Sequence, residues 1–398
     1  MLVYLEVCKQ FRPGRKHEST SNSSQTWIVP MDYDVIIVGG RVAGSALAGL
    51  LSQHEHHILL LDKAHFPSDT LSTHFFRDPA LSVFEKLGVL DEVKSAAPHL
   101  TQVWNYIDGH VISEPVRTGF EHLNYFMCVR RITLDWILAQ RVSHLPGIDF
   151  RQEAHARELI WQDGRVIGVR WSEADGAHEA TGRVIVGADG IYSTLAKSLQ
   201  PPSETQFPVQ RCMYYTYYTG IEPLDETSYA EHHFLGDSLT YVFPTDADLT
   251  LVAISLPINE FLPFKKEPLK NLRHHLDSLP LLAPRLKRAE VAGEVKGAGN
   301  IPCFQRRPYG PGWVLVGDAH QVMDPWSGMG IDHATTHASM LAESVHGYLV
   351  DEATWESAMG EFHTRARRWS EKAYRRTSTY AADLRPMTRA ALEKRGLV

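Results

Sequence analysis

Residues 33–51 read YDVIIVGGRVAGSALAGLL. The run at residues 35–38 is short, apolar and rich in β-branched side chains, which is typical of a parallel strand buried on both faces. Glycines follow at once, and the apolar residues after Gly44 recur at helical spacing. The stretch therefore predicts a strand, a tight turn and a helix whose free N–H groups and positive dipole end directly follow the turn.

This turn is suited to bind a phosphate group. A pyrophosphate binds well at a helix N-terminus, and a second apolar strand at residues 58–61 ends in Asp62, an acid placed to accept hydrogen bonds from ribose hydroxyls. Arg41 stands where the pattern G-x-G-x-x-G has its second glycine. Its side chain therefore either points away from the turn or itself meets a phosphate. Taken alone, the motif also fits an ordinary glycine-bearing strand-to-helix turn.

Composition bounds the class of protein. The 398 residues are enough for two or three domains, and 43% hydrophobic with 22% charged residues is a globular balance. The formal charge is −7 without a long basic run, which argues against nucleic acid as a partner. Four scattered cysteines predict no metal site, and no apolar stretch reaches the 18 residues of a membrane span. We therefore expect a soluble, cytoplasmic protein.

The first thirty residues differ from the rest. Residues 9–30 are basic and then rich in Ser and Thr, without a sustained apolar period or the order of a secretory signal. We predict a flexible extension at residues 1–30, and Met31 is a candidate for the natural start of the chain.

Three further motifs each lie next to a predicted element. Residues 187–190 read GADG behind an apolar strand, residues 317–319 read GDA behind another, and residues 324–331 read DPWSGMGI ahead of a helix. In this order and spacing the chain resembles, over roughly residues 33–348, the FAD-dependent oxidoreductases with the aromatic-hydroxylase fold. That family includes single-component flavoprotein monooxygenases, flavin-dependent halogenases and geranylgeranyl reductases.

The resemblance implies a set of FAD-binding residues. Gly39 and Gly44 would border the pyrophosphate, and Asp62, with its neighbour Lys63, would hold the adenosine ribose. Arg131, in the family's R-x-x-L-D helix start, would reach the cofactor. The remaining members of the predicted site are Asp189 of the middle motif, Asp318 at the ribityl chain, and Gly328, Gly330 and Ile331 beside the flavin ring.

The resemblance also implies the architecture. We expect an α/β protein with a Rossmann-like FAD-binding domain, an inserted and mainly antiparallel β-sheet substrate domain, and a C-terminal helical segment. The expected boundaries are residues 31–100, 129–204 and 298–350 for the FAD domain, 101–128 and 205–297 for the sheet domain, and 351–398 for the helical cover. The tyrosine-rich run at residues 213–218 is predicted to be a half-buried strand of the sheet domain.

Several side chains have two interpretations. His74 and Pro325 are candidate catalytic residues near flavin and substrate, although His74 also fits a structural hydrogen-bonding role. Tyr215, Tyr217, Tyr241 and Trp326 are the candidate substrate contacts. His320 either touches the cofactor or simply starts a helix, and Asp324 fits a helix cap and no more.

The implied activity is that of an FAD-dependent monooxygenase. NADPH or NADH, bound transiently, would reduce FAD, and dioxygen would then form a flavin hydroperoxide that oxygenates a small, mostly apolar substrate. An aromatic, polyketide, indole or isoprenoid compound would suit such a site. The halogenase signature W-x-W-x-I-P is absent, whereas residues 241–244, YVFP, resemble part of a motif of geranylgeranyl reductases. A reductase of isoprenoid double bonds and a non-catalytic flavin-binding protein are therefore the alternatives.

Overall fold

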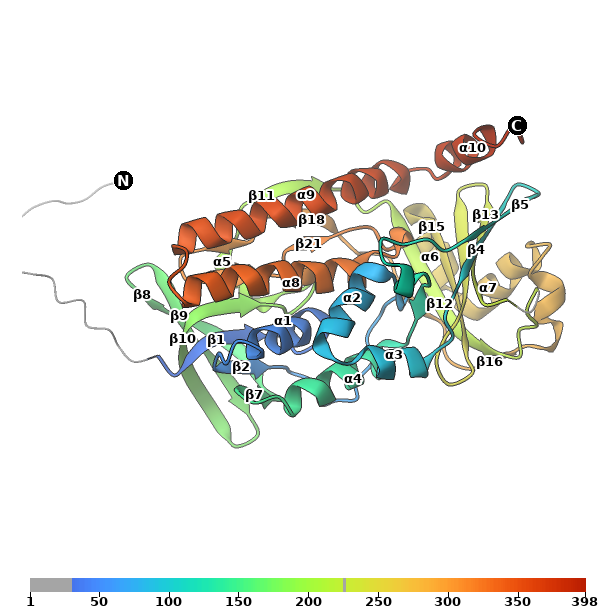
Figure 1. Ribbon diagram of the computed structural model, residues 1–398. Coiled ribbons are helices and arrows are strands. Elements are labelled where there is room, and N and C mark those ends of the chain that lie inside the picture. The colour runs from blue at the N-terminus through green and yellow to red at the C-terminus, as the bar shows by residue number, and fades with distance from the viewer. Residues whose placement is uncertain (1–30, 225–226) are drawn as a thin grey trace, which may run out of the picture. The chain divides into compact units, whose positions relative to one another are not determined.

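A computed structural model describes residues 31–224 and 227–398, so the predicted extension at residues 1–30 lies outside the described residues. The first layer is a mainly parallel sheet ordered β19-β20-β10-β1-β2-β7 (Figure 1). Its strands are β1 (Tyr33–Val38), β2 (Ile58–Leu61), β7 (Ile148–Arg151), β10 (Gly176–Gly187), β19 (Tyr309–Gly310) and β20 (Trp313–Leu315). Only β19 and β20 pair antiparallel on this path, and the hairpin of β8 (His155–Gln162) and β9 (Arg165–Glu173) extends β10.

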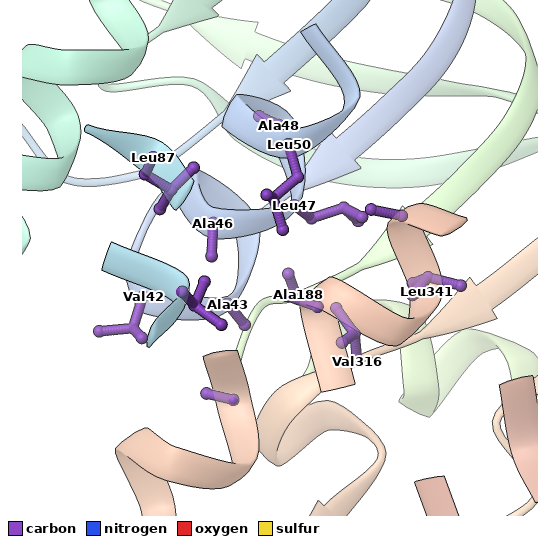
Figure 2. Packing of buried hydrophobic residues seen from close by; sticks show 14 of the residues in the cluster. Val42, Ala43, Ala46, Leu47, Ala48, Leu50, Leu87, Ala188, Val316 and Leu341 are labelled. Carbon is purple, nitrogen blue, oxygen red and sulfur yellow. The ribbon is translucent and has the colours of Figure 1, made fainter. Parts of the chain in front are cut away.

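Helices cover both faces of this sheet. Alternate residues of β1 enter different cores: Val35 and Ile37 pack with helices on one face, whereas Ile36 packs on the other. The first face carries α1 (Val42–Ser52), α2 (Asp78–Leu87), α3 (Leu90–Ala96), α4 (Arg131–Ser143) and α8 (Gly330–Leu349), and the second carries α5 (Thr194–Leu199). Figure 2 shows Ala46 of α1 in the same core as Leu87 of α2 and Leu341 of α8, and its small side chain lets neighbouring elements approach α1 closely.

The second layer is a mainly antiparallel sheet. Its order is β16-β12-β15-β14-β13-β4-β5, with β17 on β12, and only β13 and β4 pair in parallel. The strands are β4 (Gln102–Ile107), β5 (His110–Pro115), β12 (Arg211–Thr219), β13 (Tyr229–Leu235), β14 (Ser238–Pro244), β15 (Thr250–Pro257), β16 (Glu290–Val291) and β17 (Lys296–Ala298).

The tyrosine run in β12 is buried on both faces rather than on one. Tyr215 and Tyr217 face one core, and Tyr214 and Tyr218 face another. The helices α6 (Phe261–Lys265) and α7 (Pro268–Asp277) cover this second face, which the sequence pattern left as the solvent side. The strand was predicted to be half-buried, and it is buried on both faces because α6 and α7, which are distant along the chain, cover the second face.

The remaining elements connect the two layers. α9 (Trp355–Ala381) folds back along α8, and α10 (Arg385–Glu393) follows it (Figure 1). Small sheets are formed by β3 (Phe75–Phe76) with β6 (Met127–Cys128), and by β11 (Ser203–Phe207), β18 (Cys303–Arg306) and β21 (Gln321–Val322). The 3₁₀ helices are η1 (Glu121–Leu123), η2 (Ile258–Glu260), η3 (Ala283–Arg288), η4 (Gly317–Ala319) and η5 (Pro325–Ser327).

This architecture confirms the predicted fold class: a Rossmann-like α/β layer, a mainly antiparallel sheet and C-terminal helices. Among the described residues, no helix is both long and apolar enough to pass through a bilayer.

Candidate cofactor site and active site

The turn between β1 and α1 is closed by contacts that only glycine permits. Gly39 has a φ of 108°, and a Cβ atom there would lie 2.3 Å from the carbonyl oxygen of Ala188. A Cβ on Gly44 would lie 1.7 Å from the carbonyl oxygen of Gly39. Within the described residues no side chain caps α1, so its first N–H groups remain available to an anion.

Two of the later motifs meet the first one at this turn. The N–H of Ala188 donates to the carbonyl of Val38 at 2.7 Å, and the N–H of Val316 donates to the carbonyl of Gly187 at 2.9 Å. The carboxyl ends of β1, β10 and β20 therefore lie side by side, and GADG and GDA begin there. Ligands of parallel α/β sheets bind at this edge.

Asp62 fastens the turn from the end of β2. Its Oδ2 accepts a hydrogen bond from the N–H of Gly40 at 2.6 Å, and its Oδ1 accepts one from Ala64 at 2.7 Å. Each carboxylate oxygen keeps a second lone pair for a ribose hydroxyl. Its neighbour Lys63 is exposed and has no ion pair with the described residues. The contacts of both residues with a ribose remain predictions.

Arg41 turns away from the glycine turn, which settles the choice that the sequence left open. Its guanidinium bonds Asp135 of α4 at 2.5 Å and the carbonyl of Ser68 at 3.0 Å. Arg131 donates two bonds to the same carboxylate, at 2.9 and 3.0 Å. Asp135 is fully buried, and because it neutralises only one of the two guanidiniums, a positive charge remains beside the N-terminus of α1.

Asp318 and the N-terminus of α8 face open space. Asp318 is exposed, yet desolvation by the surrounding protein raises the pKa of its carboxyl to about 6, and the charge of Arg131 acts in the opposite direction. A Cβ on Gly330 would meet no atom within 4 Å, and no described side chain caps α8. The start of α8 thus offers a positive helix end, and Asp318 offers an exposed carboxyl in η4, which packs against α8.

Asp189 has one oxygen in use and one without a partner. Its Oδ2 accepts the N–H groups of Thr194 at 2.6 Å and Leu195 at 3.3 Å, at the start of α5. Its Oδ1 is buried and has no hydrogen-bond partner among the described residues. Burial raises the pKa of this carboxyl. The orphaned oxygen is available to a hydroxyl of a bound molecule.

Arg77 holds the loop between η5 and α8, and no sequence motif pointed to it. Its guanidinium bonds Asp332 at 2.8 Å and the carbonyls of Gly328 at 3.2 Å and Ser327 at 3.0 Å. Asp332 is fully buried and also accepts the N–H of Arg77 at 2.8 Å. Gly328 adopts a φ of 63°, and Ile331 is buried in the first helix turn. The predicted flavin-side loop is therefore held by a charged pair.

Trp326 joins this loop to the second sheet. Its carbonyl accepts the phenol hydrogen of Tyr241 at 2.6 Å, and its indole N–H donates to the carbonyl of Thr377 in α9 at 3.0 Å. Asp324 caps η5 by accepting the N–H of Trp326 at 3.1 Å. Pro325 begins η5 and is partly exposed. Tyr241 and Trp326 thus position the loop, whatever further contact they make with substrate.

His74 is fully buried, with both ring nitrogens in use. Its Nδ1 accepts the N–H of Arg131 at 3.3 Å, which leaves Nε2–H to donate to the phenol oxygen of Tyr217 at 2.7 Å. Desolvation lowers the pKa of His74 to about 3, so the ring is neutral at pH 7. This geometry supports the structural interpretation of His74, because the residue fixes the start of α4 against β12.

His320 also has a mainly structural environment. It is buried, and its ring lies 5.5 Å from that of His337 and 6.2 Å from that of Phe362, measured between centroids. Packing between α8 and α9 is therefore a role that neither predicted interpretation included, and contact of His320 with the cofactor stays a prediction.

A row of side chains crosses the second sheet on the face that carries Trp326. In register, it consists of Tyr215, Ala253, Tyr241, His232, Asn105 and Ile112. The Tyr215 phenol oxygen and His232 Nδ1 are buried without a hydrogen-bond partner among the described residues. Desolvation lowers the pKa of His232 to about 3, and the Tyr241 ring lies edge-on at 5.6 Å. Sequence reasoning missed His232 because only strand pairing places it beside Tyr241.

Fold and site together define a dinucleotide-binding α/β protein with a second sheet over the cofactor region. The family model described as FAD binding domain matches residues 32–237, which is more than half of the chain, so this chain belongs to that family. The chain is an FAD-dependent oxidoreductase, as the resemblance implied, and its cofactor is FAD.

Individual relatives span most of the chain. Digeranylgeranylglycerophospholipid reductase 2 of Methanopyrus kandleri is 26% identical, over 88% of this chain and 85% of the relative. The myxobacterial chondrochloren halogenase CndH has a similar fold, with a TM-score of 0.79, 22% identity, and coverage of 87% and 82%. PqsL, a probable FAD-dependent monooxygenase from Pseudomonas aeruginosa, has a TM-score of 0.75, 20% identity, and coverage of 88% and 97%.

The residues present fit FAD. The glycine turn leaves no room for a Cβ, and the uncapped α1 and the charge left by Arg41 and Arg131 favour a pyrophosphate. Asp318 adds an exposed acid in η4, which packs against α8, and no described side chain caps α8. FAD has an anionic pyrophosphate in its middle and a flavin ring that carries negative charge when reduced. Both match these features.

Proposed function

We propose that this oxidoreductase is a monooxygenase that uses NADPH or NADH and dioxygen to oxygenate a small, mostly apolar organic substrate. The observation that carries the proposal is the row on the second sheet. Its side chains form an aromatic face that is bonded to the flavin-side loop through Tyr241 and Trp326. Such a face excludes water and holds an apolar molecule against the loop.

The two unpaired polar atoms narrow the substrate class. A buried polar atom without a partner costs about 1–3 kcal/mol, a cost that a substrate hydroxyl or carbonyl removes by hydrogen bonding. His232 and Tyr215 lie three strands apart, or about 14 Å between backbones. This separation favours an extended, aromatic or polycyclic substrate with polar groups near its ends over a simple hydrocarbon.

The chain's own residues supply binding and orientation, while bound FAD supplies the activation of dioxygen. Arg77 and Asp332 fix the loop, and His74 with Tyr217 fixes the start of α4, from which Arg131, paired with Asp135, would reach the cofactor. Because desolvation lowers the pKa of His232 to about 3, its ring is a weak base, which accepts a hydrogen bond from a substrate hydroxyl without removing the proton.

A reductase of isoprenoid double bonds is the second candidate. It is favoured by the match to the Methanopyrus reductase and by YVFP at residues 241–244, which form the end of β14. The idea of a non-catalytic flavin-binding protein loses its basis, because the Arg41 side chain leaves the glycine turn free. The absence of W-x-W-x-I-P from the sequence remains the argument against a halogenase.

The experiment that separates the candidates uses the purified flavin-loaded protein with NADPH or NADH. Aromatic, polyketide, indole and isoprenoid compounds are screened in air and under argon, and products are analysed by mass spectrometry with ¹⁸O₂. The monooxygenase predicts a product that carries one labelled oxygen and forms only in air. A product that has gained two hydrogens under argon would instead establish the reductase.

A further inference from the structure

Charge is segregated strongly along this chain. Residues 364–398 contain ten Arg and Lys but only three Asp and Glu, a net charge of +7, although the whole chain carries −7. The 363 residues before them therefore carry −14. The basic segment comprises the C-terminal half of α9 and all of α10, which lie together along one edge of the molecule (Figure 1).

Three of these cations form a row without acidic partners. Arg368, Lys372 and Arg376 are exposed, follow one another at four-residue spacing on α9, and have no ion pair with the described residues. Most of the other arginines of the segment are paired, through Arg365–Glu343, Arg375–Glu371, Arg385–Asp383, Arg389–Glu393 and Arg395–Glu114. We call Arg368, Lys372 and Arg376 the basic row.

The basic row is costly for the helix that carries it. Like charges at i,i+4 destabilise a helix, and here two such pairs follow each other over about 12 Å of axis. The opposite face of α9 is anchored firmly, with Phe362, Ser370 and Tyr374 buried. The row is therefore held in place by packing on one side and presented to solvent on the other.

The anchored face also reaches the active site. The carbonyl of Thr377, next to Arg376, accepts the indole N–H of Trp326 at 3.0 Å. Trp326 belongs to the loop predicted to lie beside the flavin ring. The basic row and this loop thus lie on opposite sides of a single helix, whose diameter is about 10 Å.

We propose that the basic row is a docking surface for an acidic helix of a partner protein. Carboxylates at four-residue spacing on such a helix would match the spacing of Arg368, Lys372 and Arg376 and neutralise all three. The proposal is independent of the proposed reaction, because it rests on the outer face of α9 alone.

Two other anionic partners fit less well. Helices that bind membrane surfaces insert large apolar side chains, but among the described residues no large exposed hydrophobic side chain belongs to α9. A long duplex nucleic acid would extend beyond the row and meet the field of the remaining −14 charges, whereas a small acidic domain contacts the row alone.

The test measures how tightly a labelled peptide binds to the full chain loaded with FAD. The peptide is helical, alanine-based and fluorescein-labelled, and it carries three glutamates at four-residue spacing. Fluorescence anisotropy is recorded at low salt for wild type and for R368E/K372E/R376E. The matched control, K265E/K266E/R273E, makes the same charge change on exposed cations near α6 and α7. Flavin content and melting temperature verify that both variants are folded.

We expect the basic-row variant to weaken peptide binding at least tenfold and the control less than twofold, and the affinity to fall as salt increases. Failure of wild type to bind the peptide, or equal losses in both variants, would overturn the proposal. Tighter binding of phosphatidylcholine vesicles with 30% phosphatidylglycerol, or of a 20-base-pair DNA duplex, would also overturn it in favour of a lipid or nucleic-acid surface.

Discussion

The substitution Asp324→Asn is expected to stabilise this protein, and more so at high pH. Asp324 is 5% exposed, and desolvation raises the pKa of its carboxyl to about 6 from an ordinary value near 3.8. Among the described residues, the carboxyl of Asp324 accepts only the cap from the Trp326 N–H at 3.1 Å, which an asparagine oxygen accepts equally well. The variant therefore keeps the cap and removes a buried charge.

The magnitude follows from the pKa difference between the folded and unfolded chains. Because the folded chain holds the proton more tightly, stability falls as the pH rises from about 4 to about 6 and stays low above that range. A difference of about 2 pKa units lowers the free energy of unfolding of the wild type by about 3 kcal/mol at pH 8 and by about half as much at pH 5. The asparagine variant is expected to recover these amounts. With an unfolding entropy of about 2 cal/mol/K per residue, these values correspond to roughly 4 °C and 2 °C in melting temperature.

Thermal unfolding of the flavin-loaded protein at pH 8 and pH 5 checks this expectation. Asp324→Ala serves as a control, because it removes the charge but also the cap, and loss of the cap offsets about 1 kcal/mol of the gain. Flavin content is expected to be unchanged in Asp324→Asn, since the loop keeps its hydrogen bonds. An asparagine variant no more stable than wild type at pH 8, or equally stabilised at pH 8 and pH 5, would refute the reasoning.

Three further predictions concern the cofactor site. Gly44→Ala is expected to abolish FAD retention, because its Cβ would lie 1.7 Å from a backbone oxygen. Gly347→Ala, whose Cβ would lie in open space on α8, is the control and is expected to retain FAD. The flavin absorbance of the purified proteins measures FAD retention in both variants. Asp318→Ala is expected to lose most of its bound FAD, and a flavin content equal to that of wild type would contradict the assigned role. Asp135→Asn, which leaves two guanidiniums facing a neutral amide, is expected to cost about 3 kcal/mol, or roughly 4 °C in melting temperature; an unchanged melting temperature would argue against this ion-pair cluster.

Local patterns predicted the cofactor-binding layer well. The β-branched run of β1, the glycine turn and the helical spacing of α1 each depend on residues that are neighbours in sequence. The same holds for β2, which ends before Asp62, and for α8, which the motif DPWSGMGI predicted and which spans Gly330–Leu349. In these segments the physical signals act within one or two turns of chain, so reading them in order predicts the fold and, through the family resemblance, FAD.

Only the tertiary structure decided the direction of Arg41, the two-sided burial of the tyrosine strand and the importance of Arg77 and His232. Arg41 finds its partner 94 positions away in Asp135, and Arg77 finds Asp332 at a separation of 255. His232 faces Tyr241 because of strand pairing, and α7 buries the second face of β12 from a distant part of the chain. The sequence by itself determined the main elements of the cofactor-binding layer and, through the family resemblance, FAD as the cofactor. Which side chains meet around that cofactor depended on long-range packing, because partners far apart along the chain leave no periodic signal in it.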